Sequence, residues 1–219
     1  LEHDALAERG AEAGGAVRVP RAVNADSLAT WFLPPLAKLM AEHSVVFDIH
    51  RDDQDFTAGL LESGTVMAAV TSREAAVAGC RVAPLGMMRY EAVASAGFAA
   101  RWFADGVTPD TIAAAPLLDF DRRDELQTVW LSAQGVAASA PPRSFVPASN
   151  DFAAAVKLGL GWALLPSFQC ESDLAAGSLV RLGGEPVDVH LYWQQWNLRS
   201  PLLDSVAEAV VSEARRVLA

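Results

Sequence analysis

AVRVPRAVNADSLATWFLPPLAKLM, residues 16–40, joins an apolar run to an amphipathic run through a short polar turn. The apolar run, Ala16–Val23, predicts a β-strand, and the segment rich in Leu and Trp that follows the turn predicts a helix. The turn itself, Asn24-Ala25-Asp26-Ser27, contains side chains that favour the start of a helix. Because the first N–H groups of a helix have no partner within it, this turn suits the negative end of a small ligand.

The same helix contains Pro34 and Pro35. Proline lacks an N–H group and removes hydrogen bonds from a helix interior, so we expect a kink at this point.

The composition excludes several classes of protein. With 219 residues, 52% of them hydrophobic, the chain can bury one large core or two smaller ones. Its net charge of −10 and pI of about 4.8 argue against direct contact with nucleic-acid phosphates. The only cysteines, Cys80 and Cys170, are too few for a disulfide framework, which indicates a reducing compartment such as the cytoplasm.

The sequence predicts neither a membrane span nor a secretory signal. No stretch approaches about 18 consecutive apolar residues, so we expect no membrane partner. Residues 1–15 lack a basic leader followed by an apolar block. They are predicted to be the end of a helix that runs into a Gly-rich joint.

Strand and helix patterns alternate along the rest of the chain, as in parallel α/β sheets with right-handed crossovers. Two long strand patterns, 84–95 and 187–196, suggest that the chain crosses into a second lobe and returns. The predicted fold is α/β, with two Rossmann-like lobes joined by two crossing strands. We expect one lobe at 16–90 with 191–219 and the other at 91–190.

Four polar turns follow predicted parallel strands, at the sheet edge where ligands bind in open α/β folds. Two belong to each lobe, so we expect them to face one another across a cleft; they are 24–27, 71–72, 119–124 and 149–151. The alternative, that each polar residue only caps its helix, stays open because such caps stabilise a helix by about 1 kcal/mol.

The residue types in these turns indicate a ligand of mixed charge. Helix N-termini at Ser27 and Asn150 suit a carboxylate, whereas Asp121 suits an ammonium or guanidinium group. Glu91 and Asp124 are weaker candidates for the same role as Asp121. Trp31 lies one turn from Ser27, either in the helix core or in the wall of the pocket. A zwitterion with an additional positive charge satisfies this pattern.

Sequence signatures of enzymes and metal sites are absent. The chain has no G-x-S-x-G, P-loop, G-x-G-x-x-G or H-E-x-x-H motif. Its four histidines have no His or Cys at metal-ligand spacing. We therefore predict no catalytic residue, no metal and no cofactor.

Several motifs together resemble the effector-binding domain of LysR-type transcriptional regulators. They are N-x-D-S-L-A-T-W-x-L-P-x-L, L-G-M-M-R-Y-E-A-V-A-S, D-F-D, S-N-D-F and G-L-G-W-A-L-L-P, and the resemblance covers nearly all of 17–219. Within the family, NADSLATW and the LYW of the second long strand are similar to the ArgP/LysG (IciA) branch, which senses basic amino acids.

The resemblance implies a fold like type 2 periplasmic binding proteins, with the ligand in the cleft between the lobes. It implies a homodimer or homotetramer, L-lysine or L-arginine as effector, and control of amino-acid export genes. The corresponding ligand positions are Asn24, Ser27, Thr71, Asp121, Ser149 and Asn150. The family's DNA-binding helix-turn-helix is missing from the sequence, and residues 1–15 resemble only the tail of its linker helix. DNA is therefore expected as a partner only through that missing domain.

Two other hypotheses remain at this point. One is a free-standing solute-binding protein for a small amino acid. The other is a two-lobe enzyme, such as a deaminase or transferase.

Overall fold

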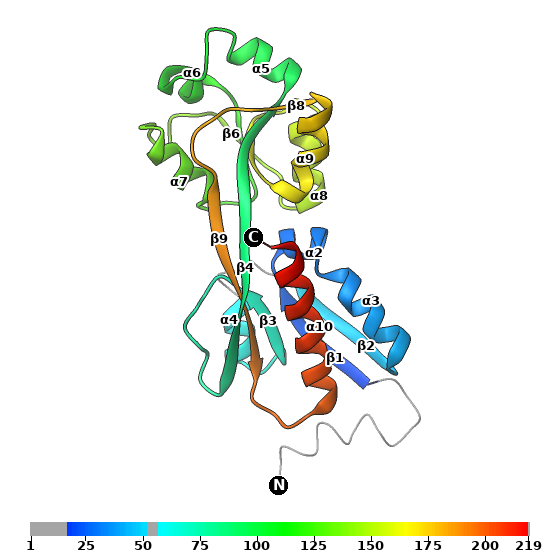
Figure 1. The fold of residues 1–219 in the computed structure, drawn as a ribbon. Helices are drawn as coiled ribbons and strands as arrows, with labels where there is room; N and C mark the ends of the chain where they lie inside the picture. The colour runs from blue at the N-terminus through cyan, green and yellow to red at the C-terminus, as the bar shows by residue number, and fades with distance from the viewer. Residues whose placement is uncertain (1–16, 52–56, 219) are drawn as a thin grey trace. The chain divides into compact units, whose positions relative to one another are not determined.

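The structure is a computed structural model that describes residues 17–51 and 57–218, without the side chains of 57 and 58. These residues form two compact units (Figure 1). Unit 1 comprises the described part of 1–87 together with 190–218, and unit 2 comprises 88–189. Each crossing between the units therefore falls slightly earlier than the sequence suggested. The expected linker remnant at 1–15 lies outside the described residues.

Unit 1 is built on a mixed sheet. β1 (Val17–Val23) lies between β2 (Val45–Arg51) and β3 (Ala68–Thr71), and all three strands are parallel. β9 (Val187–Trp196) returns from unit 2 and pairs antiparallel with β3. The helices of this unit are α2 (Ala25–Thr30), α3 (Leu33–Glu42), α4 (Thr57–Glu62) and α10 (Pro201–Val217).

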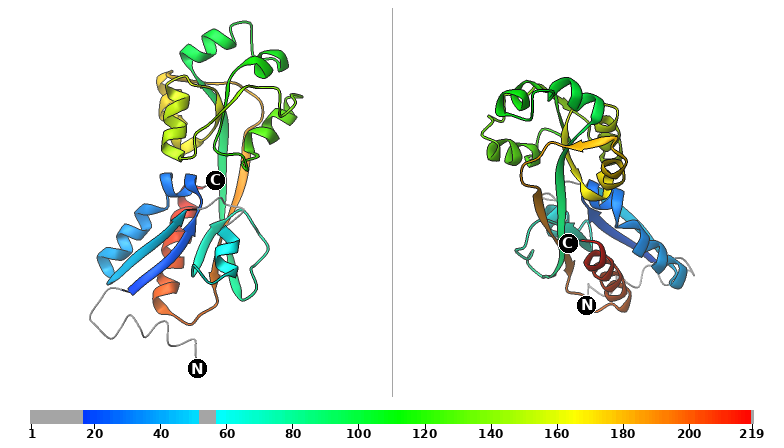
Figure 2. Two further views of the ribbon diagram at one scale, coloured as in Figure 1. Left: turned by 180° about the vertical axis from the view of Figure 1, so that it is seen from behind. Right: turned by 45° about the horizontal axis from the view of Figure 1, so that its top comes forward.

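Helices cover both faces of the unit 1 sheet, as the two views in Figure 2 show. Alternate residues of a strand point to opposite faces. Ala22 and Ala69 belong to the cluster that contains Leu61 of α4. Val19 and Val45 pack with Leu203 of α10 on the other face. Apolar residues of α10 at helical spacing are buried against the sheet, as an amphipathic helix requires: Leu203, Val206, Val210 and Ala214.

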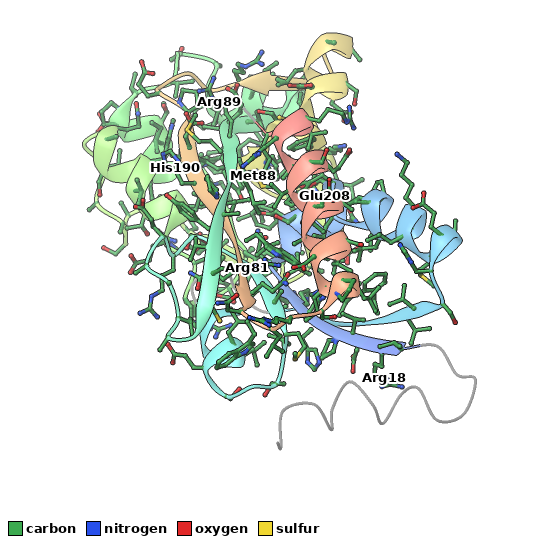
Figure 3. All side chains as sticks on the ribbon, turned by 60° about the horizontal axis from the view of Figure 1, so that its bottom comes forward. Arg18, Arg81, Met88, Arg89, His190 and Glu208 are labelled. Carbon is green, nitrogen blue, oxygen red and sulfur yellow. The ribbon has the colours of Figure 1, made fainter. Side chains whose placement is uncertain are left out.

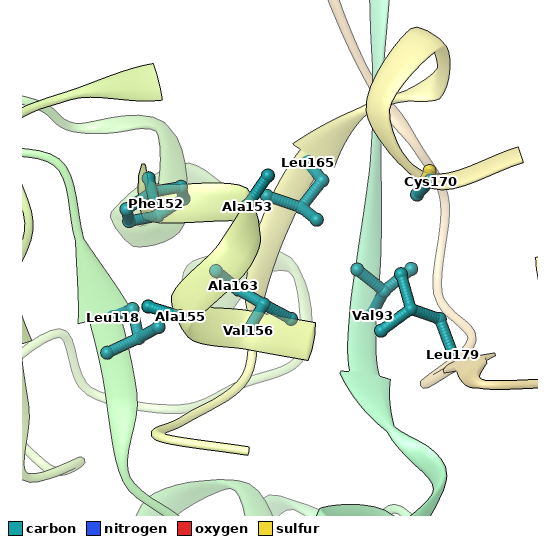
Figure 4. Close-up of a cluster of buried hydrophobic side chains, with 10 residues drawn as sticks. All are labelled: Val93, Leu118, Phe152, Ala153, Ala155, Val156, Ala163, Leu165, Cys170 and Leu179. Carbon is teal, nitrogen blue, oxygen red and sulfur yellow. The ribbon is translucent and has the colours of Figure 1, made fainter. Parts of the chain in front are cut away.

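Unit 2 contains the second half of β4 (Cys80–Ser95), which begins in unit 1. β5 (Leu117–Asp119) and β6 (Arg143–Phe145) pair in parallel, whereas β7 (Ala163–Pro166) and β8 (Leu179–Arg181) pair antiparallel with β4. The helices are α5 (Ala96–Trp102), α6 (Pro109–Ala114), α7 (Leu126–Ala133), α8 (Ser149–Lys157) and α9 (Ser167–Ala176). Val93, Phe152, Val156 and Leu165 belong to the apolar cluster at its centre (Figure 4).

The segment after β1 forms two helices rather than one kinked helix. α2 ends at Thr30, and Pro34 and Pro35 occupy the first turn of α3. Proline is well tolerated there because the first N–H groups of a helix have no acceptor within it. The expected kink was therefore wrong: the prolines begin a new helix.

Candidate functional site

The polar edge of unit 1 lies where β1 and β3 end. β1 and β3 are neighbouring parallel strands; Asn24 directly follows β1, and Thr71 is the last residue of β3. Asn24 is 4% exposed and Thr71 is fully buried. The Thr71 hydroxyl accepts a hydrogen bond of 3.1 Å from the backbone N–H of Arg73, which fixes the turn after β3.

Ser27 and Trp31 are buried in the same part of unit 1. Among the described residues, neither Ser27 Oγ nor Trp31 Nε1 has a hydrogen-bond partner. The Trp31 ring meets Phe32 edge to face, with 5.8 Å between ring centroids. Buried donors without acceptors are costly, so this part of unit 1 suits a ligand group that accepts hydrogen bonds, such as a carboxylate.

The polar edge of unit 2 begins where β5 and β6 end side by side, with Asp119 opposite Phe145. Asp121 Oδ1 accepts backbone hydrogen bonds from Arg123 at 2.7 Å and Asp124 at 3.1 Å. Asp121 therefore closes the turn after β5. Its side chain is still 26% exposed, so a role in ligand binding is compatible with this local one.

Ser149 and Asn150 follow β6, but they do not cap α8. The N-cap is Ala148, and no side chain caps the helix. Instead Gln169 of α9 donates its amide to Ser149 Oγ at 3.0 Å, and the same nitrogen lies 3.4 Å from Asn150 Oδ1. The alternative that Ser149 only caps its helix is wrong, because no side chain caps α8 and the Ser149 hydroxyl accepts a hydrogen bond from Gln169 instead.

Three acceptor oxygens of unit 2 were not among the predicted ligand positions. Asp119 Oδ1, Gln127 Oε1 and Gln169 Oε1 are buried and have no hydrogen-bond partner among the described residues. Gln127 is in the first turn of α7 and Gln169 in the first turn of α9. Only Asp119 has a signal in the sequence, because it ends the otherwise apolar run 115–118. A group with several N–H donors and a positive charge matches these oxygens.

Asp119 also forms an ion pair with Arg143 through its other oxygen. Burial raises the pKa of Asp119, although the hydrogen bond from Arg143 opposes the shift. A cation bound beside it would stabilise the ionised form further.

The weaker candidates have structural partners. Glu91 forms an ion pair of 3.2 Å with Arg181. Asp124 accepts a hydrogen bond of 2.9 Å from the backbone of Leu126 at the start of α7.

A separate surface groove of about 330 Å³ lies in unit 1 between the start of β4 and α10. Arg81 and Glu208 lie along it (Figure 3), and Trp193 forms part of its wall. Asp204 on its rim is paired with Arg81. The groove is formed by none of the predicted ligand residues.

In the part of the chain that the structure describes, no three His, Cys, Asp or Glu side chains gather closely enough to hold a metal ion. The described helices also include none with the length and apolar character needed to cross a membrane.

Two α/β units joined by two crossing strands, with polar strand ends in each, define the fold class of two-lobe ligand-binding domains. The family model "LysR substrate binding domain" matches residues 22–215. The chain therefore belongs to the LysR family, as the motifs suggested, and carries its substrate-binding domain.

Relatives of known sequence or structure support this assignment. The HTH-type transcriptional regulator LysG of Mycobacterium tuberculosis is 43% identical over 215 residues, covering 98% of this chain and 70% of LysG. The lysine export transcriptional regulatory protein LysG of Corynebacterium efficiens is 44% identical over 195 residues, covering 89% of this chain and 67% of that protein. Full-length LysG from Corynebacterium glutamicum with bound effector Arg has a TM-score of 0.85 at 34% identity, covering 99% and 73%. These relatives are transcriptional regulators, so the enzyme hypothesis is set aside.

Proposed function

We propose that this chain is the effector-binding domain of a transcriptional regulator and that its effector is a basic amino acid, L-lysine or L-arginine. The observation that carries the proposal is the group of three buried acceptor oxygens on the edge of unit 2, from Asp119, Gln127 and Gln169. Buried acceptors without donors cost free energy, and an ammonium or guanidinium group supplies several donors at once.

Unit 1 contains hydrogen-bond donors that suit the carboxylate of an amino acid. The buried hydroxyl of Ser27 and the indole N–H of Trp31 are available as donors, and Asn24 and Thr71 stand at the ends of the neighbouring strands β1 and β3. These groups suit the α-carboxylate, while Asp121, Ser149 and Asn150 accompany the three acceptors of unit 2.

The relatives support the same class of effector. One structural relative is a LysG with bound Arg, and one sequence relative is named for lysine export. By this analogy the full-length protein controls amino-acid export genes in the cytoplasm and contacts DNA through a part that this chain does not contain. A free-standing solute-binding protein is not favoured, because the matched relatives are regulators.

Calorimetric titration of the purified chain tests the effector class. L-Arginine and L-lysine are expected to bind saturably. L-Citrulline, which has nearly the shape of arginine without its charge, and L-leucine are expected to bind at least tenfold more weakly, since they leave the unit 2 carboxylates unmatched. Equal affinity for arginine and citrulline would contradict recognition of the cation.

Two variants assign the ends of the ligand. Asp121→Asn is expected to weaken arginine binding about tenfold or more while leaving citrulline binding nearly unchanged, because only the charged partner is lost. Ser27→Ala is expected to weaken both ligands by a similar factor. Unchanged arginine affinity in Asp121→Asn would remove Asp121 from the site.

We also propose that the chain assembles as a homodimer or homotetramer. Unit 1 exposes large apolar side chains close together in the chain: Leu33 and Met40 of α3 are 50% and 51% exposed, and Val46 of β2 is 38% exposed. Leu33 and Met40 are two helical turns apart and so share a face. A shared apolar face of this kind supports contact with a second copy.

A further inference from the structure

A second polar group lies inside unit 1, apart from the strand ends. Arg21 of β1 pairs with Ala68 of β3, and Ala68 pairs with Gln195 of β9. Residues directly opposite one another across a sheet point to the same face. Arg21 and Gln195 therefore flank a small methyl group, which leaves room above Ala68 for both longer side chains to approach.

Arg21 is a buried cation without a compensating charge among the described residues. Its relative exposure is 0%. Its Nη1 donates a hydrogen bond of 2.9 Å to the carbonyl of Pro20, but Nε and Nη2 have no partner among the described residues. Burial alone lowers the pKa of Arg21 to about 9, and no neighbouring carboxylate contributes to the shift. The ion pairs of the described residues do not include Arg21 either.

Gln195 presents a second donor to the same space. Trp193 Nε1 donates to Gln195 Oε1 at 3.1 Å. Because an indole N–H can only donate, this bond fixes the carbonyl toward Trp193 and turns the amide nitrogen away from it. Gln195 is fully buried and its Nε2 has no partner among the described residues. The Trp193 ring also lies 5.8 Å from the Arg21 guanidinium, so the three side chains form one cluster.

The cluster contains three unpartnered donor atoms and a positive charge. A water molecule would satisfy some of the donors but would leave the charge uncompensated, and a buried charge without a partner is strongly destabilising. A small anion satisfies both requirements. We propose that unit 1 binds a small monovalent anion of the chloride type between Arg21 and Gln195. Trp193 also lines the surface groove beside α10.

Thermal unfolding of the chain at constant ionic strength, without any amino acid, tests the proposal. The bulk salt is sodium gluconate, whose anion is too large to enter, and sodium chloride or bromide replaces it stepwise. The melting temperature is expected to rise with the logarithm of the anion concentration above the dissociation constant, by about 5–10 °C at about one hundred times that constant. A melting temperature that does not depend on which anion is present would overturn the proposal and leave water as the occupant.

Three variants test whether the rise in melting temperature with chloride or bromide comes from this site. Arg21→Met is expected to abolish the rise. Arg18→Met removes a 75% exposed arginine from the same strand (Figure 3) and is expected to retain it. Gln195→Glu places a carboxylate oxygen where Nε2 was and supplies the missing negative charge. This variant is expected to melt in gluconate at or above the temperature of the original protein in saturating chloride, with no anion response. A full response in Gln195→Glu would count against the site.

Crystals of the original protein grown with bromide test the site without any variant. Anomalous scattering is expected to show bromide within about 3.5 Å of Arg21 Nη2 and Gln195 Nε2. Absence of a peak there at saturating bromide would overturn the proposal. Because the amino-acid titration uses other residues and another ligand, failure of this proposal leaves the effector hypothesis untouched, and the reverse also holds.

Discussion

Asp119 is the residue at which burial and charge oppose each other most directly. Its carboxylate pairs with Arg143, yet burial is the larger effect and raises its pKa, and Asp121 adds to the rise. In the unfolded chain the pKa of an aspartate is about 3.9. The folded protein therefore holds this proton more tightly than the unfolded chain. Its contribution to stability is fully present below the unfolded pKa and is lost as the pH rises through the folded pKa.

The variant Asp119→Asn removes this carboxyl group and so measures its contribution to the free energy of unfolding. The free energy of unfolding of the original protein, minus that of the variant, is expected to fall as the pH rises from about 4 toward neutrality. Urea unfolding at a series of pH values measures the difference, and the exposed Asp105→Asn supplies the baseline. If the difference increased with pH instead, the ion pair with Arg143 would outweigh burial.

Single residues differ in how well their surroundings can be predicted from the sequence. The positions of Asn24 and Thr71 at the ends of neighbouring parallel strands follow from the order of those strands, which the apolar pattern already indicates. Gln127 and Gln169 lie in helices whose pattern does not distinguish them from surface glutamines, and distant segments bury them. Arg21 is visible as one of two arginines in an otherwise apolar strand. Its lack of a partner depends on neighbours that are far apart in the chain, such as Ala68 and Gln195.

At the scale of elements, most strands and helices follow from periodicity, and the exceptions occur at ends. The prolines after Trp31 predict a kink when the helix is taken as continuous, and the break at Thr30 makes them the first turn of a new helix instead. The hydroxyl of Ser149 at the start of α8 likewise accepts a hydrogen bond from Gln169, a residue of a different helix. Local propensity does not contain that information.

The approach of β7 to β5 depends on a glycine. A Cβ on Gly161 would lie 2.9 Å from Leu118 Cγ and 2.9 Å from the carbonyl of Pro116. Because one of these atoms is backbone, Gly161→Ala is expected to lower the free energy of unfolding by about 1–3 kcal/mol. Gly97→Ala in α5 meets nothing within 4 Å and is expected to raise it by up to about 1 kcal/mol. Urea unfolding compares the two; equal stability of both variants would mean that the strand moves aside without cost.

At the scale of the whole molecule, each unit has its own apolar core and its own polar edge, and β4 and β9 link them covalently. The repeated order of strand, polar turn and helix is visible in the sequence, which is why the α/β class could be predicted. The polar groups of each edge were less accessible, because buried side chains without a partner, such as Ser27 in unit 1 and Gln127 in unit 2, emerge only after packing. Polar strand ends of this kind are where α/β folds bind ligands.

Association of chains is the remaining property at this scale. Leu33 and Met40 present an apolar face on α3 that solvent would otherwise cover. Light scattering of the purified chain is expected to give two or four times 23.2 kDa. The double variant Leu33→Glu with Met40→Glu is expected to reduce the mass toward that of one chain. Burying two carboxylates without partners would cost more free energy than the apolar contact contributes. Val107→Glu changes an apolar residue of unit 2 that is 39% exposed and serves as the matched control. A monomer at millimolar concentration, or a double variant that stays assembled, would show that this face does not hold the chains together.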